Sequence, residues 1–352
     1  MQGLVVSGRS VLITGAGGSL GSALAKSIVQ LEPRHLILLD LSERNLHEIH
    51  SELKANPPRG SYVPILGDIC DAHLLSEIFE RYRPEIVYHA AAFKHVPLME
   101  SNPLAVIRNN ALGTNTLASI SRKAGVSELV MVSTDKAVNP ISVMGASKRV
   151  AELALLRWGN STKRMRALRL GNILGSVGSV VPTFLRQISQ GGPVTVTHPE
   201  VCRYFHTMSE AVELVLLTST VEVGEGIFIP KIGKPVKILD MVRQLVADFR
   251  SQSKSAPEIP ITITGLRPGD KMSEEFLYVD ESAGPTSHIE LLRVTRPGMS
   301  SEEFDSRMDM LARSVKQRDL PSTMEALCQI VPEYHPTEEL DALWQDSSVT
   351  LE

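Results

Sequence analysis

The chain has 352 residues, of which 43% are hydrophobic and 22% charged, and this composition is typical of a soluble globular protein. The formal net charge of −4 and the absence of a basic run argue against nucleic acid and anionic membranes as partners. No apolar stretch approaches the roughly 20 residues of a membrane helix, and the N-terminal residues do not resemble a signal peptide. The three cysteines have no paired spacing, so we expect a cytoplasmic protein without a structural metal.

The first predicted strand, Val11–Thr14, leads into a glycine-rich turn and then into a helix. In a dinucleotide-binding fingerprint the first glycine, here Gly15, permits the tight turn, and the second, Gly18, lets a pyrophosphate approach the backbone. The third, Gly21, lets helix and strand pack closely. Such a turn can also use glycine for geometry alone. If the fingerprint is real, the phosphates bind the first amides of the helix, those of Ser19, Leu20 and Gly21.

A second strand, Leu36–Leu39, is followed by Asp40, about twenty residues beyond the last glycine, where an acid that binds the adenosine ribose belongs. This carboxylate would accept hydrogen bonds from the ribose hydroxyls and repel a 2′-phosphate, which favours NAD. Ser42 and Arg44 follow closely and could bind that phosphate instead, so NADP stays open. Asp40 could also cap the next helix, although Ser42 fits that role equally well.

Two further strands, Tyr62–Leu66 and Glu85–Tyr88, also end in small or acidic residues. Asp68 follows the first and is placed either to accept from the adenine amino group or to close a turn. Small residues after the second would let the backbone lie against a flat cofactor. Strand ends of this kind, repeated four times, predict a dinucleotide-binding domain, with further cofactor contacts at Ile69, Ala90 and Ala91.

The most informative feature follows a fifth apolar strand, Leu129–Val132. A hydroxyl, a carboxylate and an amine come directly after it, at the strand end where open α/β sheets bind their ligands. The alternative is a surface ion pair with no catalytic role. Because a sheet core needs no such pair, we interpret the segment as an active site. The candidate catalytic residues are Thr134, Asp135, Lys136 and, twelve residues further on, Lys148.

Helices alternate with these strands and with a sixth strand, Ala167–Leu170. The regular alternation predicts a Rossmann-type doubly wound parallel α/β sheet for residues 1–170. The predicted helices are Ser19–Leu31, Arg44–Ala55, Ala72–Tyr82, Pro103–Ala124 and Met144–Trp158.

After Gly171 the chain becomes rich in glycine and proline, and its elements become shorter. We expect residues 171–285 to form a smaller mixed α/β region that caps the sheet and binds the substrate, with a strand near 226–229 returning to the core. Residues 282–300 read as a connector, and residues 286–352 as a helical C-terminal extension. The elements predicted between 171 and 285 are strands at Thr195–Thr197, Gly226–Ile229 and Ile261–Thr264, and helices at Met208–Val221 and Ile238–Phe249.

Several motifs between about Ser10 and Leu277 resemble one family. The turn Thr14–Gly21 resembles that of the extended short-chain dehydrogenase/reductases. The other motifs resemble the nucleotide-sugar 4,6-dehydratases of polysaccharide biosynthesis that act on UDP-N-acetylglucosamine. These motifs are Ala91–Pro97, Ser133–Pro140, Met144–Lys148, Gly171–Gly175, Gly192–Pro199, Arg203–Phe205 and Gly265–Lys271. Many members carry an N-terminal membrane region, and this chain resembles their soluble catalytic part.

The resemblance implies an NAD-dependent internal redox elimination on a UDP-N-acetylhexosamine. It implies oxidation at C4, loss of water across C5 and C6, and hydride return to C6, giving a 4-keto-6-deoxy sugar. Lys136 would remove the C5 proton and Asp135 would donate to the leaving C6 oxygen. At neutral pH free lysine and free aspartate each carry the wrong charge, so we expect burial and the nearby Lys148 to shift their pKa values.

One position departs from the usual short-chain dehydrogenase pattern. Met144 stands four residues before Lys148, where the family's active-site tyrosine would be. Methionine cannot carry a proton, so Thr134 becomes the candidate to hold the C4 hydroxyl and pass its proton onward. Lys148 would then bind the nicotinamide ribose.

The resemblance also implies a set of substrate contacts. Arg203 and Arg267 would bind the diphosphate through their guanidinium groups, and Asn172 would bind the diphosphate or the base. Lys94 and His95 would lie near the sugar, although His95 could be no more than a packed histidine.

Relatives are homo-oligomers that often pair through the two long helices flanking the active site, here Pro103–Ala124 and Met144–Trp158, so we expect a homo-oligomer. Three alternatives remain open at this stage: a dehydratase that inverts C5, a UDP-sugar C4 epimerase, and a dinucleotide-binding protein without catalysis.

Overall fold

Strands with apolar residues on both faces need helices on both sides, and the N-terminal half of the chain provides them. The computed structural model describes residues 6–55, 60–160, 164–222, 224–251, 258–295 and 300–345. Its main sheet has nine strands in the order β14-β15-β11-β6-β5-β4-β1-β2-β3. All neighbours from β11 to β3 pair in parallel, which confirms the predicted Rossmann-type sheet. These parallel strands are β1 (Ser10–Thr14), β2 (His35–Asp40), β3 (Tyr62–Leu66), β4 (Ile86–His89), β5 (Glu128–Thr134), β6 (Arg164–Leu170) and β11 (Gly226–Pro230).

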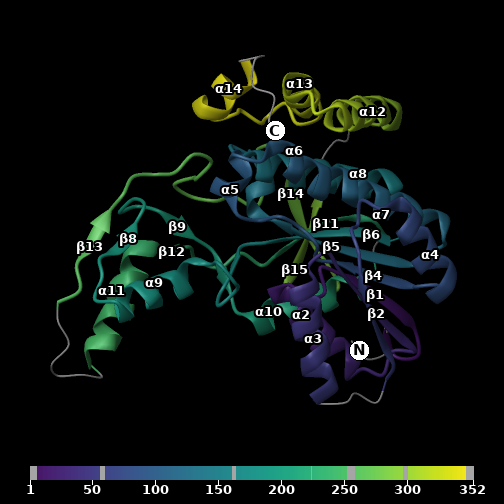
Figure 1. Cartoon of the computed structure of the whole chain (residues 1–352), viewed down its shortest axis with the longest axis horizontal. Helices are drawn as coiled ribbons and strands as arrows, with labels where there is room; N and C mark the ends of the chain where they lie inside the picture. Colours follow the sequence, from purple (N-terminus) through teal and green to yellow (C-terminus); the bar gives the residue numbers. More distant parts are fainter. Residues whose placement is uncertain are drawn as a thin grey trace.

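Two layers of helices cover this sheet (Figure 1). One face packs against α2, α3 and α10, and the other against α4, α7 and α8. The helix expected over 103–124 is helical throughout, but its middle is a π-helix, and such segments often occur at functional sites. The bounds are α2 (Ser19–Val29), α3 (Glu43–Ala55), α4 (Ala72–Tyr82), α5 (Val96–Glu100), α6 (Pro103–Val106), η1 (Ile107–Gly113), α7 (Thr114–Lys123), α8 (Val143–Trp158) and α10 (Met208–Thr218).

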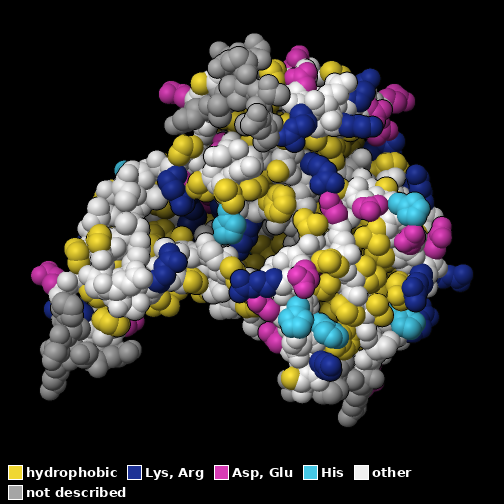
Figure 2. Space-filling view, in the orientation of Figure 1, with side chains coloured by type: hydrophobic (Ala, Val, Ile, Leu, Met, Phe, Trp, Pro, Cys, Tyr) yellow, Lys and Arg dark blue, Asp and Glu magenta, His cyan; other side chains and the backbone are white. Residues whose placement is uncertain are grey.

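A smaller mixed α/β region stands beside the carboxyl edge of the sheet and has an apolar core of its own. Figure 1 shows it as a separate lobe, and Figure 2 shows the surface hollowed between the lobe and the sheet domain, with basic and histidine side chains around the hollow. Its elements are β7 (Asn172–Ile173), α9 (Val180–Ser189), β8 (Val194–Val196), β9 (Cys202–Arg203), β10 (Phe205–His206), β12 (Val236–Lys237), α11 (Ile238–Ser251) and β13 (Ile261–Ile263).

The prediction of a plain connector over 282–300 is wrong. Two antiparallel strands, β14 (Ser282–Pro285) and β15 (Leu291–Thr295), extend the main sheet beyond β11. β15 buries Leu291 and Val294 in the core, and the proline at the end of β14 is tolerated because β14 is an edge strand. Residues 296–299 of the expected connector lie outside the described residues. The division into 1–170, 171–285 and 286–352 remains a prediction, since the main sheet takes strands from all three.

The C-terminal extension is mainly helical from residue 301 to residue 345, as predicted, but its first part contains the strand β15. Its last seven residues lie outside the described residues. Its helices are α12 (Ser301–Gln317), α13 (Leu320–Ile330) and α14 (Glu338–Gln345). Apolar residues of this extension share one buried cluster with residues of η1 and α8, and Figure 1 shows α12 and α13 lying over α6 and α8. The C-terminal helices therefore cover part of the two helices through which copies were expected to pair, and the homo-oligomer stays a prediction. None of the helices in the described ranges is both long and apolar enough to cross a bilayer.

The packing of α12 can be tested by removing one buried side chain. Leu311 is fully buried, and we expect Leu311→Ala to lower the free energy of unfolding by about 2–5 kcal/mol, because it loses apolar contacts and leaves a cavity. Urea denaturation measures this change. Met310→Ala, at the exposed neighbouring position, is the control and should change stability by less than about 0.5 kcal/mol. Equal effects of the two substitutions would contradict the packing described here.

Candidate functional site

The glycine-rich turn lies directly against the end of β4. Gly15 has a φ of 68°, and a Cβ added there would lie 2.6 Å from the backbone nitrogen of Ala91. A Cβ added at Gly21 would lie 1.9 Å from the carbonyl oxygen of Gly15. Glycine is therefore required at both positions, and the turn presents bare backbone at the start of α2, as pyrophosphate binding needs. The turn, the small residues Ala90 and Ala91, and the first turn of α2 come together as the sequence predicted.

The first turn of α2 also contacts the smaller lobe. The Ser19 hydroxyl accepts a hydrogen bond from the Val177 amide at 3.0 Å, while Leu20 is buried in the core. Gly18 closes the turn by donating its amide to the Gly15 carbonyl at 3.1 Å. The residues predicted to hold phosphates therefore lie where the two parts of the molecule meet.

Asp40 is buried beneath the glycine-rich turn. One carboxylate oxygen accepts from the Gly17 amide at 2.8 Å and the other from the Ser42 amide at 2.8 Å. Each oxygen keeps a lone pair that a ribose hydroxyl can use. The Ser42 hydroxyl accepts from the Asn45 amide at 3.3 Å at the start of α3, so the cap belongs to Ser42. Arg44 is highly exposed and pairs with Glu48 along α3 at 3.0 Å.

Asp68 stabilises the turn after β3 and also forms an ion pair. It accepts from the Cys70 amide at 2.8 Å and pairs with Arg108 of η1 at 2.9 Å. Burial raises the pKa of Asp68, but the Cys70 amide and Arg108 outweigh this and hold it below its usual value. Ile69 is buried, and a Cβ added at Gly113 would lie 2.9 Å from its side chain. Arg108 was not anticipated, because nothing in its helical sequence marks it as a partner of Asp68.

The π-helix places an amide side chain beside the end of β4. Asn110 accepts from the Phe93 amide at 2.9 Å and donates to the Phe93 carbonyl at 2.9 Å. It also donates to the Ser147 hydroxyl on α8 at 3.1 Å. These bonds tie η1, the segment after β4 and the active-site helix together. Asn110 was also missed at the sequence level.

The catalytic candidates form one cluster at the carboxyl end of β5. Asp135 is fully buried, and its Oδ1 accepts from the Thr134 hydroxyl at 3.0 Å and from Lys136 Nζ at 3.0 Å. Its Oδ2 is buried and has no hydrogen-bond partner among the described residues. Lys136 Nζ also donates to Asn172 Oδ1 at 3.3 Å and lies 3.3 Å from Glu274 Oε1. Three predicted catalytic residues and one predicted substrate contact therefore form a single hydrogen-bonded cluster.

The expected lowering of the Lys136 pKa is not found. Burial does lower it, but the charges of Asp135 and Glu274 outweigh burial and the opposing charge of Arg203, so the pKa of Lys136 is raised. In this state the amine is an ammonium group that donates to two oxygens and forms an ion pair with a third. The sequence did not reveal this, because Glu274 lies far from Lys136 along the chain.

Lys148 is buried, whereas Lys136 is only half-buried, and the two lysines have opposite electrostatic balances. Burial lowers the pKa of Lys148 to about 8, with only Glu152 acting against it. Within the described ranges its Nζ has no hydrogen-bond partner. Met144 is buried in the apolar cluster shared with the C-terminal helices. A Cβ added at Gly145 would lie 2.3 Å from the Lys136 carbonyl oxygen. The first turn of α8 therefore packs against the turn Asp135–Ala137, which we call the catalytic turn.

A buried network of charges lies below this cluster. Arg169 of β6 forms two hydrogen bonds of 2.9 Å with Glu152 of α8, and it also pairs with Glu281. Ser133 donates to Glu152 at 2.7 Å, and Arg149 pairs with it at 2.9 Å. Burial raises the pKa of Glu152, but Arg169 and Arg149 outweigh burial and bring it to about 2. The network joins β5, β6, α8 and the segment before β14.

The predicted substrate contacts are only partly brought together. Arg203 is buried and donates to the Cys202 carbonyl at 2.7 Å. Arg267 lies in an exposed loop and pairs with Asp270 at 2.8 Å. Lys94 and His95 are both exposed after β4, and a Cβ added at Gly178 would lie 2.3 Å from the His95 ring. Of the five predicted substrate residues, Asn172 alone contacts the catalytic amine directly.

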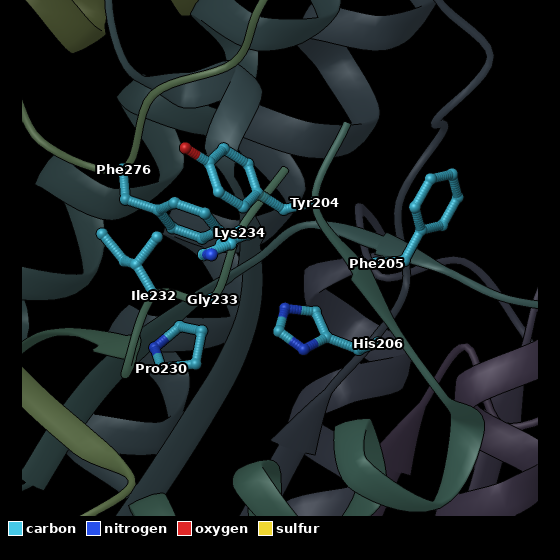
Figure 3. A pocket seen from close by; sticks show the side chains of 8 residues that line it. All are labelled: Tyr204, Phe205, His206, Pro230, Ile232, Gly233, Lys234 and Phe276. Atoms are coloured by element: carbon cyan, nitrogen blue, oxygen red, sulfur yellow. The ribbon is translucent and has the colours of Figure 1, made fainter. Parts of the chain in front are cut away.

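A small pocket lies beside the cluster, between the smaller lobe and the end of β11 (Figure 3). The rings of Tyr204 and Phe276 meet edge to face at 5.2 Å between centroids. His206 points toward the segment 230–234, and its Nε2 is buried without a partner among the described residues. Sequence reasoning missed His206, which lies just beyond the motif Arg203–Phe205. No cluster of three or more metal-binding side chains occurs in the described part of the chain.

The family described as "Polysaccharide biosynthesis protein" matches residues 11–296. The capsular polysaccharide biosynthesis protein CapD of Staphylococcus aureus is 46% identical over 276 residues, which are 78% of this chain and 46% of CapD. The chain spans about half the length of the first curated relatives it matches. A UDP-N-acetylglucosamine 4,6-dehydratase (inverting) of Campylobacter jejuni is 32% identical over 78% of this chain and 79% of that protein. The X-ray structure of Pen from Bacillus thuringiensis superposes with a TM-score of 0.76 at 26% identity, covering 87% of this chain and 98% of Pen.

The buried charge network makes a prediction about stability. We expect Glu152→Gln to lower the free energy of unfolding by about 3–5 kcal/mol, because it leaves two buried guanidinium groups without their shared carboxylate. Guanidinium chloride denaturation measures the loss. Glu77→Gln, which makes the same change at an exposed helix position, is the control and should cost less than about 0.5 kcal/mol. A loss of stability in Glu152→Gln no larger than that of the control would disprove the stabilising role of the buried charge network.

Proposed function

The chain belongs to the polysaccharide biosynthesis protein family, and on that premise we propose that it is a nucleotide-sugar 4,6-dehydratase that uses NAD. The proposed substrate is a UDP-N-acetylhexosamine, in the first place UDP-N-acetylglucosamine, and the product is its 4-keto-6-deoxy derivative. The observation that carries the proposal is the cluster of Thr134, Asp135 and Lys136 at the carboxyl end of β5, with one buried oxygen of Asp135 unpartnered. A buried carboxylate with a free oxygen beside an amine suits an elimination that needs an acid and a base.

The cofactor residues fit a dinucleotide. The bare backbone from Gly15 to Gly21 would hold the pyrophosphate, and Asp40 would accept hydrogen bonds from the ribose hydroxyls. A bound nicotinamide would supply the hydride acceptor for oxidation at C4 and the hydride donor for reduction at C6. NAD is favoured over NADP because the Asp40 carboxylate lies under the turn, where it would repel a 2′-phosphate, and because Arg44 is exposed and already paired with Glu48.

The proton released at C4 has a direct path to Asp135. Thr134 donates its hydroxyl proton to Asp135 Oδ1, so it can accept the proton of the C4 hydroxyl while passing its own to the carboxylate. Asp135 then becomes the protonated acid that the leaving C6 oxygen requires. In this scheme Thr134 takes over the proton transfer for which Met144 has no group.

The remaining proton moves between the sugar and Lys136. As a free amine Lys136 takes the C5 proton while Asp135 protonates the C6 oxygen, which leaves as water. Lys136 returns its proton to C5 when hydride reaches C6, and both side chains regain their starting forms. The C4 hydroxyl proton thus leaves in the water, and the cycle needs no proton from bulk solvent. The resting ammonium must lose one proton to enter the cycle, so activity should rise with pH.

Proton NMR of the full chain incubated with NAD and UDP-N-acetylglucosamine tests the proposal. We expect a new C6 methyl doublet, and the C5 configuration of the product shows whether the enzyme inverts that centre, as the name of the Campylobacter relative states for that protein. A C4 epimer without a methyl signal would replace the dehydratase by an epimerase. NAD binding without turnover of several UDP-sugars would favour a non-catalytic protein.

The base is tested by Lys136→Ala. This variant should lower dehydration by about 100-fold or more, because general base catalysis contributes that much, and it should still bind NAD. Lys123→Ala, at an exposed position on α7, is the control and should keep the wild-type rate. Full turnover by Lys136→Ala in the same NMR assay would rule out Lys136 as the base.

The cofactor turn is tested by Gly21→Ala. The added Cβ would lie 1.9 Å from the Gly15 carbonyl oxygen, so α2 must move away from the turn, and we expect NAD affinity to fall about tenfold or more, equivalent to about 1.4 kcal/mol. Isothermal titration calorimetry measures the affinity. Gly284→Ala on edge strand β14 meets no atom within 4 Å and should bind NAD as the wild type does. Unchanged NAD affinity in Gly21→Ala would show that the glycine-rich turn does not bind the cofactor.

A further inference from the structure

A second carboxylate lies against the catalytic amine and comes from a distant part of the chain. Glu274, in the segment between β13 and β14, is buried, and its Oε1 lies 3.3 Å from Lys136 Nζ. The same oxygen lies 3.6 Å from Arg203 Nε. Its Oε2 is buried and has no hydrogen-bond partner among the described residues. The amine of Lys136 therefore lies between Asp135 and Glu274.

The segment that carries Glu274 is fastened to the catalytic turn on both sides of it. Before Glu274, Lys271 donates to the Val138 carbonyl at 2.6 Å. After it, the Tyr278 hydroxyl donates to the Ala137 carbonyl at 2.7 Å, and the Phe276 carbonyl accepts from Arg169 at 2.7 Å. These contacts hold Glu274 in a fixed place relative to Lys136.

A second buried carboxylate needs a physical reason, because removing a charge from water is costly unless the charge is compensated. Asp135 alone already pairs with Lys136, and Asn172 provides a further acceptor. The charged groups around the amine are Asp135 on its own turn, Glu274, and Arg203 on β9, with Lys271 and His206 also near this cluster. The negative charge of Glu274 compensates the positive charge of Arg203. The site can therefore keep the positive charge of Lys136 as well.

Resting on the proposed function, we propose that Glu274 is a positioning residue for the elimination: with Asp135 it holds the amine of Lys136 between two carboxylates and so sets when that amine can accept the C5 proton. Glu274 acts through Lys136 and transfers no proton to the sugar. Its charge favours the ammonium form that exists after the C5 proton has been taken, and opposes the free amine that must precede it.

The sign of the effect follows from this balance. Lys136 can act as a base only above its pKa, and the charges of Asp135 and Glu274 raise that pKa against the effect of burial. When the charge of Glu274 is removed, only Asp135 still opposes burial and Arg203, which both lower the pKa of Lys136. The free amine then forms at lower pH, by about one pH unit or more, which is the usual effect of one opposite charge at this distance.

The first test reads the charge of Lys136 without using catalysis. Trace acetic anhydride labels only free amines, so labelling of Lys136 in the full chain, measured against pH by peptide mass spectrometry, gives the pH at which the amine is half deprotonated. We expect this pH to fall by about one unit or more in Glu274→Gln. It should change less in Glu274→Asp, which keeps the charge. Glu275→Gln, the same change at the exposed neighbouring residue, should label as the wild type does.

The second test follows dehydration of UDP-N-acetylglucosamine against pH in the same variants. In Glu274→Gln the part of the pH profile where kcat rises should move to lower pH by the same amount as the labelling. The maximal kcat should be lower than in the wild type, and Glu274→Asp should restore part of it. Unshifted labelling in a folded Glu274→Gln chain, or a lower rate at every pH with an unshifted pH profile, would overturn the proposal. A wild-type chain that turns over no UDP-sugar while its Glu274→Gln variant shows the labelling shift would refute the proposed function and uphold the charge link between Glu274 and Lys136.

Discussion

The site depends on one buried ion pair, between Arg169 of β6 and Glu152 of α8. Both side chains are fully buried, and each would be costly to bury without the other. Through Ser133 the pair contacts the end of β5, and through Glu281 it contacts the segment that carries Glu274. The strand that ends in the catalytic turn, the helix that carries Lys148 and the segment that supplies Glu274 therefore share one charged anchor. Movement of any of these elements would leave a charge buried without its partner.

Two lysines near this anchor, the half-buried Lys136 and the buried Lys148, lie under opposite electrostatic conditions. Lys136 faces two carboxylates, and its pKa is raised, whereas burial lowers the pKa of Lys148 to about 8 with only Glu152 acting against it. Burial acts on both in the same direction, so the difference comes from the carboxylates that the fold places near Lys136. The fold therefore gives two amines on neighbouring elements different proton affinities, which suits a reaction with more than one proton-handling role.

The C-terminal helices also constrain the position of α8. α12 and α13 bury apolar side chains against η1 and α8, and Met144 lies within the same cluster. The position that a tyrosine would occupy in the usual short-chain dehydrogenase is thus part of an apolar contact. This contact supports the first turn of α8, which rests on the Lys136 carbonyl through Gly145.

The sequence alone determined the parallel sheet, the glycine turn and the cluster at the end of β5, because these depend on residues close together in the chain. Apolar runs predict buried strands, and a glycine spacing predicts a backbone geometry that tolerates no Cβ. Local patterns could not show that residues 282–295 add two strands to the sheet, because pairing with β11 decides it. They also could not show that Glu274 lies against Lys136 or that Arg108 pairs with Asp68. Such contacts, and the pKa values they set, join segments distant in the chain, so only tertiary packing decided them.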